Sequence, residues 1–276
     1  MKIIFDERCL EFNEPGHPES PERVRRAAEY LRGRCDHEFL KPEPAREEDL
    51  LLVHTPGLIE SVKNLTFYDW DCPRYPNIYE YALLAAGGAI LAAEVGGFSL
   101  MRPPGHHVGR DFLGGFCYFN NIAIAVKRSG KRTLILDIDA HHGNGTQDIF
   151  LGDPQVVYVS LHRSPLYPGT GLSSVQNCFN FPLPARCGDE VYLSTLDRAL
   201  EQALQDFQPE QVAISAGFDG YERDPLASLG LSIETYREVG ARIAKLGKPV
   251  FAVLEGGYVP EALGPLIEAL IRGLTR

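Results

Sequence analysis

Residues 134–145 read LILDIDAHHGNG, an apolar run that stops abruptly at polar residues. Two aspartates are followed by two adjacent histidines and then by glycines. In an extended chain, residues i, i+2 and i+4 point to the same side. Asp137, Asp139 and His141 are therefore expected to share one face. Carboxylates and imidazoles rarely gather for packing alone, so the pattern indicates a functional cluster at the end of a strand.

Length and composition favour one soluble domain. The chain has 276 residues, of which 44% are hydrophobic and 23% charged. These values suit a single domain over residues 1–276 with an ample core. No run of about 18 apolar residues appears, and the N-terminal MKIIFDERCLEF meets acidic residues too soon for a signal peptide. We expect a cytoplasmic protein without a membrane partner.

Charge and cysteine content narrow the classes of partner. The net charge is −10 and the basic residues are scattered, which argues against a nucleic-acid partner. The six cysteines form no CxxC pair and are predicted to be reduced thiols rather than zinc ligands or disulfides. The sequence leaves the oligomeric state open.

Short apolar runs alternate with longer amphipathic stretches along the chain. The expected strands are Lys2–Phe5, Phe98–Arg102, Thr133–Asp139, Val156–Leu161, Gln211–Ala216 and Pro249–Leu254. The expected helices are Pro21–Leu31, Asn77–Glu94, Asn120–Arg128, Glu190–Asp206, Ile233–Leu246 and Glu261–Leu274. Strands that alternate with helices indicate parallel βαβ units. We predict an α/β three-layer sandwich with a central, mostly parallel sheet.

Polar residues fall at the same place in five of these runs. The expected strands lead into PPGHH, DIDAHH, LH, GFD and EGGY. Ligand sites in parallel sheets form beyond the carboxyl ends of the strands. The five clusters are therefore expected to build one site.

A metal ion is the first hypothesis for this site. Asp139 and His141 from one strand end and Asp219 from another offer two carboxylates and one imidazole. Three protein ligands leave a position open for water, as in catalytic zinc sites; iron or cobalt would suit the same ligands. The alternative is that Asp139 caps a turn and His141 lies on the surface. Asp137 is interpreted as a carboxylate that orients an imidazole, rather than as a fourth ligand.

Two histidines and one tyrosine are candidates for proton transfer and charge stabilisation. His106 and His107 follow two prolines and a glycine at a strand end, and imidazole exchanges protons near neutral pH. Tyr258 follows two glycines and could donate to a developing oxyanion. Each of these residues could instead be an ordinary packing residue.

Together the motifs carry a resemblance to a known family. RPPGHH, GGFCYFNN, LDIDAHHGNGTQDIF, SLHRSPLYPGTG, SAGFDGYERDP and EGGY occur in this order, and GHPESPERV precedes them. They resemble the zinc-dependent histone deacetylases and acetylpolyamine amidohydrolases over nearly the whole chain. The resemblance implies an arginase/deacetylase-like fold.

It also implies a role for each matching residue. The metal ligands would be Asp139, His141 and Asp219, binding Zn²⁺; His107 would be the main general base and acid, His106 its partner paired with Asp137, and Tyr258 the group that polarises the amide carbonyl. Gly115, Phe116 and Tyr167 would line an acyl channel. A monovalent cation, usually K⁺, would lie on Asp137, Asp139, His141, Ser160 and Leu161.

Some positions depart from the pattern or bear on the substrate. Asn144 stands where some members have aspartate, and Tyr167 replaces the commoner phenylalanine. Polyamine-selective members carry a glutamate seven residues after the metal aspartate, where this chain has Leu226. Asp71 resembles the rim aspartate that grips the backbone of acetyl-lysine peptides; alternatively it caps the helix expected from Asn77.

The predicted function is removal of acetyl or other acyl groups from lysine side chains of peptides or proteins. Acetylpolyamine hydrolysis is the main alternative. A dinuclear manganese ureohydrolase is disfavoured, because His142 stands where its second metal would need an aspartate. A binding module without turnover is disfavoured because Tyr258 and the metal ligands are all present.

Overall fold

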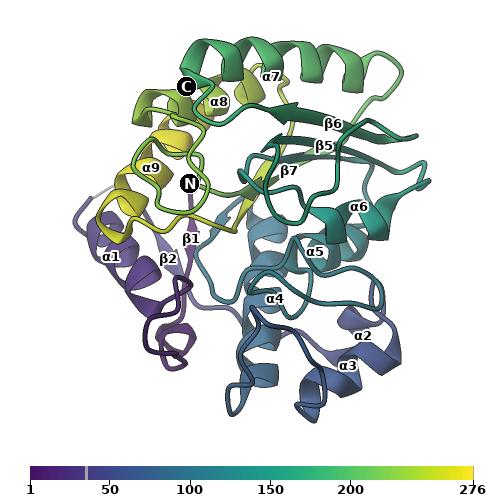
Figure 1. Cartoon of the computed structure of the whole chain (residues 1–276), viewed down its shortest axis with the longest axis vertical. Coiled ribbons are helices and arrows are strands. Elements are labelled where there is room, and N and C mark those ends of the chain that lie inside the picture. The colour runs from purple at the N-terminus through teal and green to yellow at the C-terminus, as the bar shows by residue number, and fades with distance from the viewer. Residues whose placement is uncertain (35–36, 276) are drawn as a thin grey trace.

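A single parallel sheet forms the centre of the molecule (Figure 1). The computed structural model describes residues 1–34 and 37–275. Within them, eight strands lie in the order β2-β1-β3-β8-β7-β4-β5-β6, and every neighbouring pair is parallel. The strands are β1 (Ile3–Ile4), β2 (Phe39–Leu40), β3 (Phe98–Ser99), β4 (Thr133–Asp137), β5 (Val156–Arg163), β6 (Cys178–Leu183), β7 (Gln211–Ala216) and β8 (Val250–Leu254).

Helices cover both faces of this sheet. They are α1 (Pro21–Arg32), α2 (Glu47–Leu50), α3 (Pro56–Lys63), α4 (Ile78–Val95), α5 (Asn121–Ser129), α6 (Asn144–Phe150), α7 (Gly188–Leu204), α8 (Ile233–Ala244) and α9 (Pro260–Leu274), with a 3₁₀ turn at Glu7–Leu10. Side chains of α1, α7, α8 and α9 pack in one core, and those of α3, α5, α6 and most of α4 pack in the other; Leu84 and Ala85 of α4 belong to the first core. The predicted three-layer α/β sandwich is confirmed, and its sheet is wholly parallel.

The inner strands are buried on both faces, which explains their apolar sequences. All five residues of β4 and all six of β7 are buried. Parallel strands with helices on both sides read as continuous Val/Ile/Leu runs rather than as alternating patterns. Asp137 pairs in register with Ser160 of β5 and Ser215 of β7. The loops that follow β3, β8, β7, β4 and β5 consequently begin at one edge of the sheet.

Several short elements were not predicted. These are β2, β6, α2, α3 and α6, and the strands β3 and β4 end at Ser99 and Asp137, earlier than expected. The early end of β4 means that Asp139 and His141 converge with Asp137 through a turn and not along a strand. The His141 N–H donates to Asp139 Oδ1 over 2.8 Å within that turn.

Helix α4 explains the most apolar segment of the chain. It is the one helix in the described residues that is long and apolar enough to cross a membrane, with 18 residues and a mean hydropathy of 1.4. Half of it is buried inside the fold, and most of its buried residues belong to the core that it shares with α5, while α4 also packs on β8. Its composition therefore follows from its place in the core.

Candidate active site

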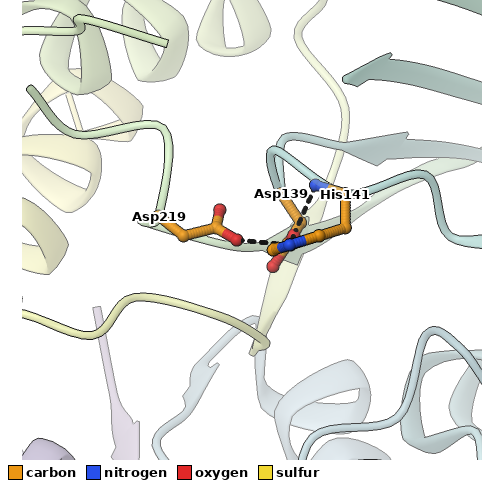
Figure 2. Close-up of side chains that lie close together, drawn as sticks. All are labelled: Asp139, His141 and Asp219. Carbon is orange, nitrogen blue, oxygen red and sulfur yellow. Dashed lines mark hydrogen bonds and ion pairs between the residues drawn. The ribbon is translucent and has the colours of Figure 1, made fainter. Parts of the chain in front are cut away.

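Three side chains from two loops converge at the carboxyl edge of the sheet (Figure 2). Asp139 and His141 come from the loop after β4, and Asp219 comes from the loop after β7. His141 Nδ1 lies 3.0 Å from Asp139 Oδ1 and 2.7 Å from Asp219 Oδ2. One ligand atom from each residue falls within 4.8 Å of the others. Both carboxylates are almost completely buried, and the His141 side chain is only 13% exposed, so the alternative of a surface histidine is wrong. Asp139 does cap its turn through the His141 N–H, and it also lies in the cluster.

The arrangement fits a divalent cation. Asp219 Oδ2 is buried and forms no hydrogen bond of acceptable geometry, although it lies close to the His141 ring. Burial and the neighbouring carboxylate of Asp139 raise the pKa of Asp219 to about 7. Two carboxylates and one imidazole are groups that bind zinc. Three such protein ligands leave one of the four coordination positions of the metal open. A cation among these atoms would satisfy the unpaired oxygen and relieve the repulsion between the two acids.

His106 is held by a buried carboxylate. Its Nδ1 donates to Asp137 Oδ2 over 3.1 Å, and the Tyr158 hydroxyl donates to the same oxygen over 2.9 Å. Burial disfavours a charged ring here, but Asp137 and Asp139 outweigh it and raise the pKa of His106 to about 10. Asp137 is thus placed to orient an imidazole, as the sequence predicts, and is also bound to a tyrosine that the sequence did not reveal.

His107 lies beside His106 and has the opposite electrostatic preference. The two ring centres are 4.0 Å apart. His107 Nδ1 donates to Asn144 Oδ1 over 2.8 Å, which leaves Nε2 free to accept a proton. Burial and the nearby rings of His106 and His141 hold the pKa of His107 well below its usual value. A neutral ring with a free Nε2 suits a general base.

Tyr258 completes the surroundings of these groups. Its ring lies edge-on to Phe116 with 5.9 Å between centres, and the guanidinium of Arg23 stacks on it at 4.8 Å. The main-chain N–H of Tyr258 donates to Asp224 Oδ2 over 2.8 Å. Burial raises the pKa of Tyr258 well above its usual value, so the phenol keeps its proton and can donate it in a hydrogen bond.

A cavity of about 250 Å³ opens above the histidines and His141. The five residues predicted to contact substrate all line it: Asp71, Gly115, Phe116, Tyr167 and Leu226. His106, His107, His141 and Tyr258 also line it. The structure therefore brings the predicted substrate-binding, proton-transfer and metal-binding residues together around one space.

The wall formed by Gly115 and Phe116 depends on an unusual main chain. Gly115 has φ of 57° and Phe116 has φ of 70°, both in the left-handed region. A Cβ at Gly115 would lie 2.8 Å from His107 Cγ, so only glycine fits there. A phenylalanine in this region is rare and costs about 1–3 kcal/mol. The strain lies at the cavity wall, where it brings Phe116 against Tyr258.

Asp71 lies at the mouth of the cavity and does not cap a helix. The residue that caps α4 is Asn77, so the alternative interpretation of Asp71 as its cap is wrong. The Asp71 carbonyl accepts a hydrogen bond from His17 Nε2 over 3.3 Å. On other parts of the wall lie Tyr167, 44% exposed, and Leu226, 38% exposed.

Three of the five residues predicted for a monovalent cation, Asp137, Ser160 and Leu161, are neighbours in the sheet, and Asp139 and His141 lie in the loop after β4. Ser160 lies opposite Asp137 in the β4–β5 ladder, and Leu161 follows it. The Ser160 hydroxyl lies 2.9 Å from His162 Nδ1. The potassium ion itself stays a prediction from the resemblance.

Two buried residues that were not predicted from the sequence, Arg23 and Glu255, bind the main chain around the site. Arg23 is buried and donates to the carbonyls of Glu255 and Gly257, each over 2.6 Å. Glu255 is completely buried and binds the main chain before His107. Both residues occur in the motifs SPERV and EGGY, but the main-chain groups that they bind here lie more than 100 residues away in the sequence. A charged residue inside a glycine motif at a buried strand end was the available signal for Glu255.

Comparison with known sequences agrees with this geometry. The sequence profile of the histone deacetylase domain matches residues 17–274. A probable deacetylase of Archaeoglobus fulgidus is 39% identical, over 95% of this chain and 82% of its own length.

Two solved structures are similar over nearly the whole chain. The HDA15 HD domain has a TM-score of 0.90 and 33% identity, covering 99% of this chain and 87% of its own. An acetylpolyamine aminohydrolase from Burkholderia pseudomallei has a TM-score of 0.91 and 25% identity, covering 99% and 98%. The described architecture is thus shared with the HDA15 HD domain and with an acetylpolyamine aminohydrolase.

Proposed function

Because this chain belongs to the histone deacetylase family, we propose that it is a zinc-dependent amidohydrolase that removes acyl groups from lysine side chains of peptides or proteins. The observation that carries the proposal is the convergence of Asp139, His141 and Asp219 beneath the cavity that His107 and Tyr258 line. A divalent ion held by these ligands supplies Lewis-acid chemistry, polarising the amide carbonyl and acidifying water.

The side chains supply the proton transfers. His107 Nε2 takes a proton from the attacking water, while Asn144 keeps the other ring nitrogen protonated. Tyr258 donates its hydroxyl hydrogen bond to the oxygen on which negative charge develops. His107 then returns the proton to the leaving amine. His106 is paired with Asp137, and its ring packs against the ring of His107, which limits how far the His107 ring can move.

The amine carrier is proposed from two residues at the mouth. Leu226 lines the cavity, at the position where the polyamine-selective pattern requires glutamate, and its side chain cannot pair with a distant ammonium. Asp71 offers a carboxylate at the rim, where it can accept N–H groups of a peptide. These features favour acyl-lysine over acetylated polyamines. Acetylpolyamine hydrolysis is the second candidate function, because the chain is similar to an acetylpolyamine aminohydrolase.

Dinuclear manganese chemistry is disfavoured by the surroundings of His142. Its two ring nitrogens lie 2.8 Å from Thr170 Oγ1 and 3.1 Å from Gln147 Oε1. Both are engaged, so His142 is not available to a second metal ion.

Substrate preference is tested by kcat/KM on acyl-lysine peptides, acetylspermidine and acetylputrescine. We expect the wild type to prefer a peptide. Leu226→Glu should shift the ratio towards acetylspermidine because a carboxylate then faces the second ammonium, and Leu226→Gln controls for polarity without charge. Asp71→Ala should impair peptides more than small amides, with Asp71→Asn as its control. Faster turnover of an acetylated polyamine than of every acyl-lysine peptide would establish the alternative substrate.

A further inference from the structure

Glu255 is a buried acid at the site to which the proposed chemistry assigns no role. It follows β8 directly, and β8 lies between β3 and β7 in the sheet. Its side chain therefore stands between the end of the strand that leads to His106 and the strand that leads to Asp219. Its exposure is 0%, so each oxygen needs a partner inside the protein.

The carboxylate of Glu255 binds the chain that carries the two histidines. Oε2 accepts from the N–H groups of Gly105 and His106, over 2.7 and 3.1 Å. Oε1 accepts from the Ser215 hydroxyl over 3.0 Å. Since Pro103 and Pro104 have no N–H group, Glu255 takes the first two main-chain donors after Arg102.

The main chain of the same segment is fixed in turn. Arg23 donates to the carbonyl of Glu255 over 2.6 Å, and the Gly256 N–H donates to Asp139 Oδ2 over 2.8 Å. Glu255 thus links the turn that carries His106 and His107 to a segment that itself contacts a predicted metal ligand. A shift of that turn would move both rings relative to the metal ligands.

These contacts require a side chain long enough to bring its hydrogen-bond acceptor to the N–H groups of Gly105 and His106. They do not require that side chain to be charged. The ring of His106 forms its ion pairs with Asp137 and Asp139, not with Glu255. Burial raises the pKa of Glu255 to about 7, against the opposing effects of the His106 ring and of the Gly105 and His106 N–H groups. A neutral amide of the same length could make equivalent contacts, with its oxygen on the N–H groups and its nitrogen on the Ser215 oxygen.

We propose that Glu255 is a positioning residue, whose side-chain oxygens fix the main chain of Gly105 and His106 and thereby aim the rings of His106 and His107 at the reacting atoms. The catalytic part of this inference rests on the proposed function. The part that concerns the main chain rests on the contacts alone.

Two variants separate the effect of side-chain length from the effect of charge. Glu255→Gln keeps the length and removes the charge, whereas Glu255→Asp keeps the charge but is shorter by one methylene. A misplacement of about 1 Å can cost on the order of 100-fold in rate. We expect Glu255→Asp to lower kcat by about 10- to 100-fold with KM and metal content unchanged, and Glu255→Gln to stay within about threefold of the wild type. The matched control is Glu268→Asp, which should keep the wild-type kcat. It shortens a buried glutamate on α9 that binds Tyr30 and Arg272.

Hydrogen–deuterium exchange at the Gly105 and His106 amides gives a readout that needs no turnover. Both amides should stay protected in Glu255→Gln and lose protection in Glu255→Asp, with or without metal. Equal protection in the two variants, or a kcat that Asp preserves and Gln does not, would overturn the proposal. A wild type that hydrolyses no acylated amine would instead overturn the proposed function, while the exchange result would still decide the role of Glu255.

Discussion

At the scale of single residues, the phenol of Tyr258 is the donor whose loss is easiest to isolate. Tyr258→Phe removes the hydroxyl but keeps the ring that lies under the Arg23 guanidinium and edge-on to Phe116. Because removal of one oxyanion donor costs about 10²–10³ in kcat, we expect a loss of that size with metal content unchanged. His107→Ala should lose at least as much. The assignment fails if Tyr258→Phe keeps more than about half of the wild-type rate, measured at saturating substrate.

A second residue-scale prediction concerns stability and pH. His54 is buried between Gly109 O, 2.9 Å from Nδ1, and the Asn120 N–H, 3.0 Å from Nε2. Burial lowers its pKa from 6.5 to about 4. Between those pH values the His54 ring binds a proton in the unfolded chain but not in the folded chain. The contribution of His54 to the free energy of unfolding is therefore complete above pH 6.5 and is lost as the pH falls towards 4.

Urea unfolding between pH 7.5 and 4.5 measures this effect. Burial also lowers the pKa of His142 to about 4 and that of His162 to about 3, so their contributions have the same sign. We expect the free energy of unfolding to fall with pH, and His54→Gln to reduce the slope without abolishing it. A wild-type stability that is constant over this range would contradict the assignment of buried neutral imidazoles.

At this scale the sequence revealed residues that lie close together in a motif and missed those whose partners are distant. Asp137, Asp139 and His141 lie within five consecutive positions, and a parallel sheet brings Asp219 to the same edge. Glu255 and Arg23 contact each other across 232 residues. Their roles are set by the packing of β8 against β3 and α1 against α9, and no local pattern reports that packing.

At the scale of elements, α4 allows a test of how tightly the helical layer packs. Gly87 lies inside the helix, where alanine would ordinarily be more stable by about 1 kcal/mol. A Cβ there would overlap the carbonyl oxygen of Glu43 and lie 2.9 Å from Ala45 N. Gly87→Ala should therefore lower the melting temperature. The control Ala93→Gly, at a half-buried position, should cost only its helix propensity, about 1 kcal/mol; a smaller loss for Gly87→Ala than for this control would contradict the packing.

Elements that the sequence did not predict share two physical causes. The strands β2 and β6 lie at the two edges of the sheet; β2 has only two residues, and β6 contains Pro182, which an edge strand tolerates. The helices α2, α3 and α6 have four, eight and seven residues, too short for a clear periodicity. Thr55 before Pro56 was a usable start signal for α3, because its side chain accepts from Leu58 N.

At the scale of the whole molecule, the order of the strands explains why one site collects residues from most of the chain. The neighbouring strands β3, β8, β7 and β4 supply His106, Glu255, Asp219 and Asp137 to one edge. The sequence predicted the layers and this shared edge from the alternation of strands and helices. It could not give the strand order, which depends on contacts between segments that are far apart.

One divalent ion on Asp139, His141 and Asp219 is proposed to drive hydrolysis of an acylated amine. Metal analysis of the purified protein, combined with turnover of an acetyl-lysine peptide, tests this assignment. We expect about one equivalent of zinc per chain, loss of turnover on chelation, and loss of both metal and turnover in Asp139→Ala. Two bound manganese ions with release of urea from guanidino substrates, or full turnover by the metal-free protein, would contradict it.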